Sequence, residues 1–338
     1  MKNKDKRPTI YDVAQQAKVS ITTVSRFLNN PSSVNETTAD TIAMVMEQLD
    51  YIPQGNAGRR AMRDVGRVGI LTPFYPAPSF VQRLRGMVPV FRKHRHEIVV
   101  YTIESSEQLD EYISSVPFTR RLDGLILMSV RLTREQRRRL LDSGMEIIMI
   151  ECEDKSFSSV VSDDYQGGKL AADLFIEKDY FPCAFIGDKN RDISYSLHPS
   201  DLRFEGFRER LVKKGKTLPE QLILESDTTV DDAENVFGRF LDSGNHIRAV
   251  FTMSDLQAIG AVRACKARGL RLPQDVAVLG FDDIDASGWM EISTISQHLS
   301  ESGRVAATLL SERIASREEA PVVQKINLQV SLVERATT

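Results

Sequence analysis

Short apolar runs recur along most of the chain, and the stretches between them are mostly long enough to form amphipathic helices. The runs are rich in β-branched residues, which favour strands. They are Val68–Leu71, Ile98–Tyr101, Gly124–Met128, Ile147–Ile150, Ala184–Ile186, Ala249–Thr252 and Val276–Leu279. Strands that alternate with helices predict parallel sheets with helices on both faces.

The first fifty residues have a different pattern, which predicts three short helices over residues 9–50. Thr9 precedes an apolar series, and Asp12 lies three residues after Thr9, so Thr9 and Asp12 together predict a capping box. Ser20 and Asn35 are predicted N-caps of the second and third helices. Lys18-Val19 forms the turn between the first two helices, and two short helices joined by such a turn are typical of a helix-turn-helix unit.

The second helix, in the stretch VSITTVSRFLN, has two distinct sides at 100° per residue. Val24, Phe27 and Leu28 lie in one sector and can pack on a neighbour. The opposite sector is polar and shallow, and it holds Ile21, Thr22, Ser25, Arg26 and Asn29. Short hydroxyl side chains can reach base edges or phosphates, which favours DNA as the partner, although an ordinary amphipathic helix in a bundle remains an alternative.

Composition and charge limit the class of protein. With 338 residues, 41% of them hydrophobic, the chain can bury a sizeable core, and its length suggests two or three domains. Residues 1–67 have a net charge of +3, whereas the whole chain has −3. A basic N-terminal region is consistent with phosphate contacts. Because neither a hydrophobic signal region nor a membrane span is evident, we expect an intracellular protein whose three cysteines are buried thiols.

Several polar residues follow the predicted strands directly, where α/β folds bind their ligands. Glu151 follows one strand, Asp255 another and Asp282 a third. Carboxylates near aromatic rings suit a polyhydroxyl ligand such as a sugar, because they accept hydrogen bonds from hydroxyl groups. The same residues could instead cap helices and form turns.

Two long motifs resemble one family, the lactose repressor/galactose repressor (LacI/GalR) family. TIYDVAQQAKVSITTVSRFLNN, followed by Tyr51-Ile52-Pro53, resembles its DNA-binding headpiece. TMSDLQAIGAVRACKARGLRLPQDVAVLGFDD, at residues 252–283, resembles its core, and VSLVERATT resembles its usual ending. The resemblance implies an all-α helix-turn-helix headpiece and an α/β core of two Rossmann-like subdomains with parallel sheets, like periplasmic binding proteins.

The resemblance also implies domain boundaries. The headpiece would span residues 1–53, a hinge or linker residues 54–66, and an effector-binding and dimerisation core residues 67–338. Within the core, the N-subdomain would comprise about 67–162 and 292–321, and the C-subdomain about 163–291 and 322–338.

Individual site residues follow from the same similarity. Arg203 matches the arginine that holds the effector in the family, and Asp282 matches the cleft aspartate. Ser254 and Glu151 depart from the family pattern, with Ser254 in place of an asparagine and Glu151 one methylene longer than an aspartate. The expected effector-binding residues are Tyr75, Phe80, Ser129, Glu151, Arg203, Asp255, Asp282 and Trp289.

The expected DNA contacts extend over the headpiece and the hinge. They are Thr9, Tyr11, Ser20, Ile21, Thr22, Thr23, Ser25, Arg26, Asn29, Ala57 and Arg60. Arg60 occupies the position of the family's minor-groove leucine and cannot act as an apolar wedge, and two nearby glycines disfavour a helix. We therefore expect a weaker hinge helix and a smaller or different bend in the DNA.

These features predict a transcription regulator, expected to repress carbohydrate-utilisation genes by binding a near-palindromic double-stranded operator as a homodimer. A small molecule, expected to be a sugar, would control the affinity for DNA. The dimer surface is expected around Phe80–Met87 by resemblance, and the absence of a leucine-heptad helix after the core argues against a tetramer. No phosphate loop, nucleophile elbow or HExxH motif is present, so neither an enzyme nor a cofactor, metal site or membrane contact is expected. Two alternatives remain: a catabolite-type global regulator with a phosphoprotein co-effector, and a solute-binding protein.

Overall fold

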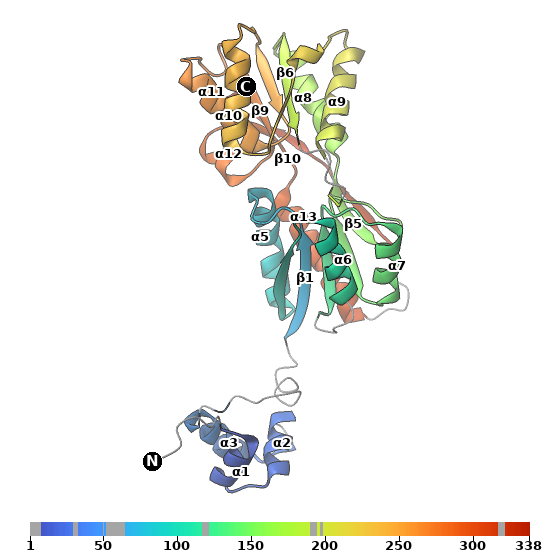
Figure 1. The fold of residues 1–338 in the computed structure, drawn as a ribbon, viewed down its shortest axis with the longest axis vertical. Coiled ribbons are helices and arrows are strands. Elements are labelled where there is room, and N and C mark those ends of the chain that lie inside the picture. The colour runs from blue at the N-terminus through green and yellow to red at the C-terminus, as the bar shows by residue number, and fades with distance from the viewer. Residues whose placement is uncertain are drawn as a thin grey trace. The chain divides into compact units, whose positions relative to one another are not determined.

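The computed structural model describes residues 8–29, 33–49, 51, 65–116, 122–189, 195–196, 199–316 and 322–338. The chain divides into two compact units, one up to Gly66 and one from Arg67 onward (Figure 1). In the part of the chain that is described, no helix is both long and apolar enough to cross a lipid bilayer.

The described part of the first unit consists of three helices, α1 (Ile10–Gln16), α2 (Ile21–Asn29) and α3 (Glu36–Gln48). Apolar side chains from all three pack into one small core. Its buried members are Val13, Ala14, Ala17, Val24, Leu28, Ile42 and Val45. The helices predicted over residues 9–50 are therefore confirmed.

Polar side chains satisfy the backbone at the start of each helix. The Asp12 carboxylate accepts a hydrogen bond from the Thr9 backbone N–H at 2.6 Å. Ser20 Oγ accepts from the Thr23 N–H at 3.0 Å, and Asn35 Oδ1 accepts from the Thr37 N–H at 3.0 Å. These bonds stabilise helix ends whose first N–H groups have no partner within the helix, and they confirm the predicted starts.

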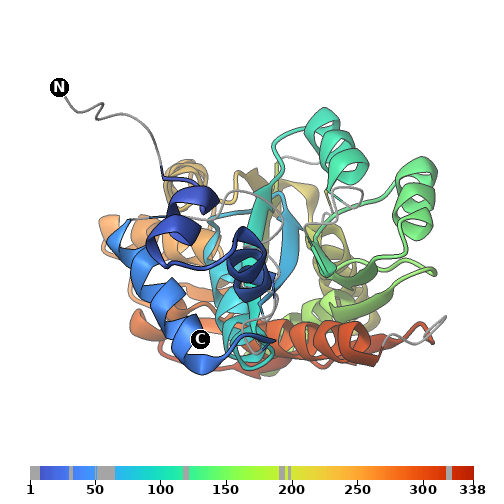
Figure 2. The same ribbon diagram turned by 90° about the horizontal axis from the view of Figure 1, so that it is seen from below.

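The second unit contains two sheets, and we call each sheet with its covering helices a subdomain. The first subdomain has the strand order β11-β5-β4-β3-β1-β2, and neighbours from β11 to β1 pair in parallel. These strands are β1 (Gly66–Thr72), β2 (His96–Thr102), β3 (Gly124–Met128), β4 (Glu146–Ile150), β5 (Ser158–Ser162) and β11 (Lys325–Leu328). Separate apolar clusters lie on the two faces of the sheet, one beneath α5 (Pro78–Lys93) and α13 (Leu299–Ser316) and the other beneath α6 (Ser106–Ser115) and α7 (Arg134–Asp142). Figure 2 shows α13 in red on the opposite side of the strands from the green α6 and α7.

The second subdomain has the strand order β12-β10-β9-β8-β6-β7, parallel except for β12, which runs antiparallel to β10. Its strands are β6 (Cys183–Asp188), β7 (Ile223–Ser226), β8 (Ala249–Thr252), β9 (Ala277–Asp282), β10 (Ser293–Ser296) and β12 (Ser331–Val333). Its helices are α8 (Asp164–Glu177), α9 (Pro199–Lys213), α10 (Val230–Asp242), α11 (Asp255–Ala267) and α12 (Asp285–Trp289). All seven predicted strands are present, and the prediction of largely parallel sheets is confirmed.

The predicted division between the subdomains is wrong at its second and third boundaries. The prediction places residues 292–296 in the first subdomain, but β10 pairs with β9 in the second sheet. It places residues 322–338 in the second subdomain, but β11 pairs with β5 in the first sheet. The described chain therefore passes between the sheets after Ser162, after Ser296 and after Leu328, because pairing between distant strands decides sheet membership.

Several pairs of helices pack so closely that their backbones touch at glycines, and two of these pairs matter for the site below. A Cβ atom on Gly303 of α13 would lie 2.0 Å from the carbonyl oxygen of Arg83 on α5. A Cβ atom on Gly168 of α8 would lie 2.0 Å from the carbonyl oxygen of Arg203 on α9. These close approaches fix the helices that hold Arg83 and Arg203, two arginines that the site below depends on.

The three cysteines, Cys152, Cys183 and Cys265, are buried free thiols, as predicted. Burial raises the pKa of each thiol to about 12. A thiol with so high a pKa forms little thiolate near neutral pH and is therefore unreactive.

Candidate functional site

Helix α2 presents the polar surface that the sequence predicts. Thr22 and Arg26 are exposed, and Ile21 has 43% of its surface exposed. On the opposite side Val24 and Leu28 are buried in the core of the helical unit. The exposed side is therefore available to a partner, while the buried side fixes the orientation of the helix.

The other predicted contacts of the headpiece occupy different positions. Tyr11 is largely exposed on α1. The Ser20 and Thr23 hydroxyls lie 2.8 Å apart at the start of α2, so they hold each other as well as the helix end. Ser25 is half-buried, Asn29 is the last residue of α2, and Ala57 and Arg60 lie outside the described residues.

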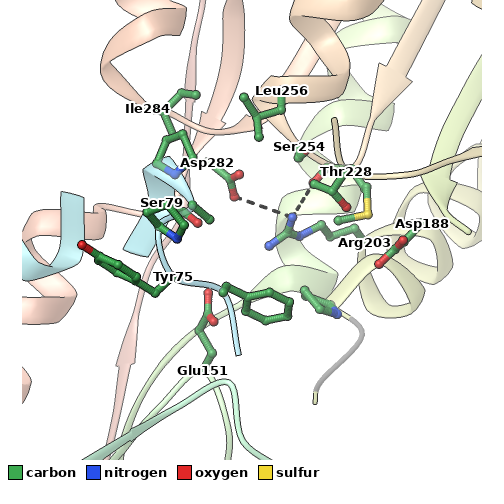
Figure 3. A pocket seen from close by; sticks show the side chains of 16 residues that line it. Tyr75, Ser79, Glu151, Asp188, Arg203, Thr228, Ser254, Leu256, Asp282 and Ile284 are labelled. Carbon is green, nitrogen blue, oxygen red and sulfur yellow. Dashed lines mark hydrogen bonds and ion pairs between the residues drawn. The ribbon is translucent and has the colours of Figure 1, made fainter. Parts of the chain in front are cut away.

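A cavity of about 300 Å³ lies between the two subdomains of the second unit (Figure 3). The first subdomain contributes residues 74–79 and Glu151, and the second contributes residues from five segments. These are Asp188, Pro199, Arg203, Thr228, Met253, Ser254, Leu256, Asp282 and Ile284. Most of the lining residues end or follow a strand at its carboxyl end, so the predicted position of the cleft is confirmed.

Arg203 reaches the cavity from α9 and is held on several sides. Its Nε donates to Asp164 Oδ1 at 2.8 Å, and its Nη1 donates to the Met253 carbonyl. Asp282 Oδ1 lies 3.7 Å from Nη1, and the guanidinium carbon lies 3.7 Å above the centre of the Phe281 ring. These contacts restrict the guanidinium to one orientation at the cavity wall.

Asp282 ends β9 and faces the cavity from the second subdomain. Its Oδ1 accepts a hydrogen bond from Gln297 Nε2 at 2.5 Å. Burial raises the pKa of Asp282 above its ordinary range, and the positive charges of Arg203 and Arg83 oppose the increase. The carboxylate is therefore poorly hydrated, and a hydrogen-bond donor from a ligand would stabilise it.

Glu151 directly follows β4 and faces the cavity from the first subdomain. Its carboxylate accepts hydrogen bonds from Arg83 and from the Ser129 hydroxyl. Its φ of +65° is in the left-handed region, which is uncommon for a residue other than glycine. The backbone and two side-chain partners thus determine where this carboxylate points.

Four predicted effector-binding residues do not line the cavity in the described structure. Phe80 is 1% exposed in the core beneath α5, where its ring packs edge-on against Tyr75 with centroids 5.3 Å apart. Trp289 is 82% exposed at the end of α12. Ser129 is buried and its hydroxyl donates to Glu151, so Ser129 positions a residue that lines the cavity but does not line the cavity itself.

Asp255 is the fourth predicted residue that does not line the cavity. Its side chain is fully buried, and its carboxylate accepts hydrogen bonds from the Ile284 N–H at 2.9 Å and the Thr294 hydroxyl at 2.6 Å. The two bonds tie the start of α11 to the segment after β9 and to β10 itself. Asp255 therefore supports the segment next to Asp282 and does not face the cavity.

Sequence reasoning missed Arg83, Gln297 and several lining residues. Arg83 is 2% exposed, and its guanidinium donates to Glu151, Gln297 and Ser302. A signal for it exists in the sequence, because the spacing of Phe80, Arg83 and Met87 puts an arginine on the apolar face of a helix. The missed lining residues include Asp188, Thr228 and Met253, and no motif distinguishes them.

Two sequence families match different parts of the chain. Residues 9–54 match the family described as "Bacterial regulatory proteins, lacI family". Residues 172–338 match the family described as "Periplasmic binding protein-like domain". The first range corresponds to the helical unit. The second range covers most of the second subdomain and also β11, which belongs to the first subdomain.

Full-length relatives agree with both matches. The chain is 28% identical over 341 residues to a ribose operon repressor from Halalkalibacterium halodurans, covering 98% of this chain and 97% of the relative. It is 25% identical over 309 residues to catabolite control protein A from Priestia megaterium, covering 90% of this chain and 92% of the relative. The solved structure of the lac repressor dimer bound to operator and the anti-inducer ONPF has the same fold, with a TM-score of 0.78 and 24% sequence identity. The match covers 98% of this chain and 99% of the lac repressor chain. The chain therefore combines a headpiece that matches the lacI family of bacterial regulatory proteins with a core that matches the periplasmic binding protein-like domain.

Proposed function

We propose that the protein is a sequence-specific DNA-binding repressor whose affinity for its operator is set by a small molecule bound in the cleft. The observation that carries the proposal is the exposed face of α2, where short polar side chains lie opposite a buried apolar side in a helix-turn-helix unit. The protein would act on genomic DNA in the cytoplasm, and it would regulate by binding the DNA rather than by catalysing a reaction.

The cleft supports the ligand part of the proposal. Its volume is at the lower end of the range for small-molecule sites, which suits a ligand the size of a simple sugar. Tyr75 and Phe74 offer aromatic faces, while Glu151 and Asp282 offer acceptors for hydroxyl groups. Because the cavity contacts both subdomains, a ligand can favour one arrangement of them over another and thereby change the affinity for DNA.

A homodimer would place two headpieces on two half-sites of a near-palindromic operator. Helix α5 offers a surface for this contact, because Val81 and Val88 are exposed on it while Phe80 and Met87 face the core. Sedimentation of the wild-type protein and of Val88→Glu tests this surface. A monomeric variant is expected, and an unchanged dimer would contradict the assignment.

The function is tested by selecting fragments of the source genome with the purified full-length protein. We expect a few fragments to be retained against excess bulk competitor DNA, and a panel of mono- and disaccharides to change that retention. The proposal would be refuted if no fragment were retained more strongly than the bulk competitor DNA with any of the sugars tested.

One relative favours a second candidate function. Catabolite control protein A is a full-length relative at 25% identity, so a global regulator that responds to a phosphoprotein co-effector is the alternative. Operator affinity measured with and without a phosphoprotein fraction separates the two functions. A change produced by the protein fraction and by no sugar would favour the second.

A further inference from the structure

Two carboxylates face each other across the cleft from different subdomains. Glu151 follows β4 of the first subdomain, and Asp282 ends β9 of the second. Both line the cavity, and Figure 3 shows their carboxylates on opposite sides of the same space. A carboxylate accepts hydrogen bonds and cannot donate them when ionised, so a ligand that bridges this gap must bring donors to both sides.

The positive charges near the cleft are already matched by acids. Arg203 is bonded to Asp164 and lies 3.7 Å from Asp282. Arg83 lies behind the wall with 2% of its surface exposed, paired with Glu151. Each guanidinium therefore neutralises an acid of the site and leaves little positive potential for an anionic ligand.

Counted over the described lining residues, acids outnumber bases. Glu151, Asp188 and Asp282 are the acids, and Arg203 is the base. Burial is the main reason that the pKa of Asp164 and that of Asp282 are both raised, while Arg203 and Arg83 oppose the increase and Glu151 adds to it. When all four are ionised, Glu151, Asp188, Asp282 and Arg203 give the lining a formal charge of −2.

We infer that the cleft selects its ligand by charge: it binds neutral or amine-bearing sugars through donors shared between Glu151 and Asp282, and it rejects sugar phosphates and sugar acids. The inference rests on the proposed function, because it specifies the ligand of the same cleft. Hydroxyl and ammonium groups both supply the required donors, whereas a phosphate or carboxylate would meet like charge in a partly desolvated space.

The test uses matched sets of sugars and calorimetric titration of the full-length protein. Each set contains one parent sugar, its 2-amino derivative, its terminal phosphate and its uronic acid. In the set that binds, we expect the neutral or amino form to bind at least about tenfold more tightly than either anion. The comparison of parent with amino form shows whether hydroxyl or ammonium donors are preferred.

Charge-removing variants connect the result to the cleft. Glu151→Gln keeps the shape of the side chain and should reduce the preference over anions by about tenfold or more. Asp188→Asn should also reduce the preference over anions, and it leaves the Arg83–Glu151 ion pair in place. Glu301→Gln is the matched control, because Glu301 is paired with Arg304 on the surface of α13, and it should leave the preference unchanged.

Two outcomes overturn the inference, and they differ in what else they affect. Binding of the phosphate or the uronic acid as tightly as the parent sugar overturns the charge selection alone and leaves the proposed function intact. Failure of every set to bind overturns the sugar ligand of the proposed function, and the charge selection falls with it. The selection of DNA fragments is unaffected in both cases.

Discussion

Arg83 and Glu151 form an ion pair that joins helix α5 to the wall of the cleft. The Arg83 side chain is almost completely buried, and it also donates to Gln297 and to Ser302 of α13. Gln297 in turn donates to Asp282. The two carboxylates of the cleft are thus connected through α5 and through the segment where the chain returns from the second sheet to the first.

Replacing Arg83 tests how much this connection contributes to stability. Arg83→Met keeps the apolar stem but leaves Glu151 without its cationic partner. We expect the free energy of unfolding to fall by about 3 kcal/mol, the lower part of the range for breaking a buried pair, because Glu151 retains some solvent contact. Urea denaturation measures the change. Arg304→Met, which breaks the exposed pair with Glu301, is the control and should barely move the midpoint.

Arg203 contributes to the fold as well as to the cleft. Arg203→Ala would leave Asp164 and Asp282 buried without their cation, so we expect a loss of stability of about 3 kcal/mol or more, together with a loss of ligand response. Tyr75→Ala is the cleaner probe of the cleft, because this side chain is about half exposed and lines the cavity. It should weaken ligand binding in calorimetry with little change in the urea midpoint. A Tyr75→Ala protein that binds ligand normally would contradict the assignment of the cleft.

The buried acids predict how stability depends on pH. Burial and the charge of Asp282 raise the pKa of Asp255, and burial raises that of Asp282. The folded protein therefore keeps protons that the unfolded chain releases from about pH 4 upward, and stability should fall as the pH rises from there toward neutrality. Urea midpoints measured between pH 5 and 7.5 report this slope.

The variant Asp255→Asn should flatten that slope. Its amide oxygen can accept from the Ile284 N–H while its amide nitrogen donates to Thr294, so the loop keeps both contacts. Asp231→Asn, at an exposed acid of α10, should retain the wild-type slope. An equal slope in wild type and Asp255→Asn would show that another group is responsible.

The close contact of α5 and α13 predicts a strong effect of one methyl group. Gly303→Ala would place a Cβ atom 2.0 Å from a backbone oxygen of α5, so the helices must separate. We expect a loss of roughly 1–3 kcal/mol, as for other overpacked cores, visible as a lower melting temperature. Gly288→Ala on α12 is the matched control, because its nearest neighbouring atom is 4.0 Å away. Equal melting temperatures for the two variants would contradict the contact.

Thr22 tests the DNA-binding face. Thr22→Ala should leave the helical unit folded, because the side chain is exposed, and should reduce discrimination between operator and bulk DNA by roughly 1–3 kcal/mol if the hydroxyl makes a good base contact. Competition binding with labelled operator measures the change. Thr41→Ala, at an exposed hydroxyl of α3, should leave discrimination unchanged. Similar losses in both variants would argue against a specific role for α2.

Local patterns predicted much of the fold. The apolar runs identified β1, β3 and β4 because each is a continuous buried stretch. The side chains of Ser20 and Asn35 identified helix starts because capping depends on neighbouring residues only. The position of the cleft followed in turn, because polar residues after parallel strands gather at one edge of a sheet.

Long-range contacts explain what the sequence could not predict. The strands β10 and β11 are short, and their membership of a sheet depends on partners far away in the chain. Asp255 follows β8 and Asp282 ends β9, yet only Asp282 faces the cavity, because the fold turns Asp255 toward Ile284 and Thr294. Phe80 and Tyr75 differ in the same way, since one packs under a helix and the other reaches the cleft.

The three passages of the chain between the sheets have a practical consequence for dissecting this protein. Neither subdomain is encoded by one uninterrupted stretch, because β11 completes the first sheet and β12 the second within the same short segment. A nonsense codon placed just before Lys325 would remove an edge strand from both halves at once. Isolating either half for study would require splicing separate pieces of the gene together.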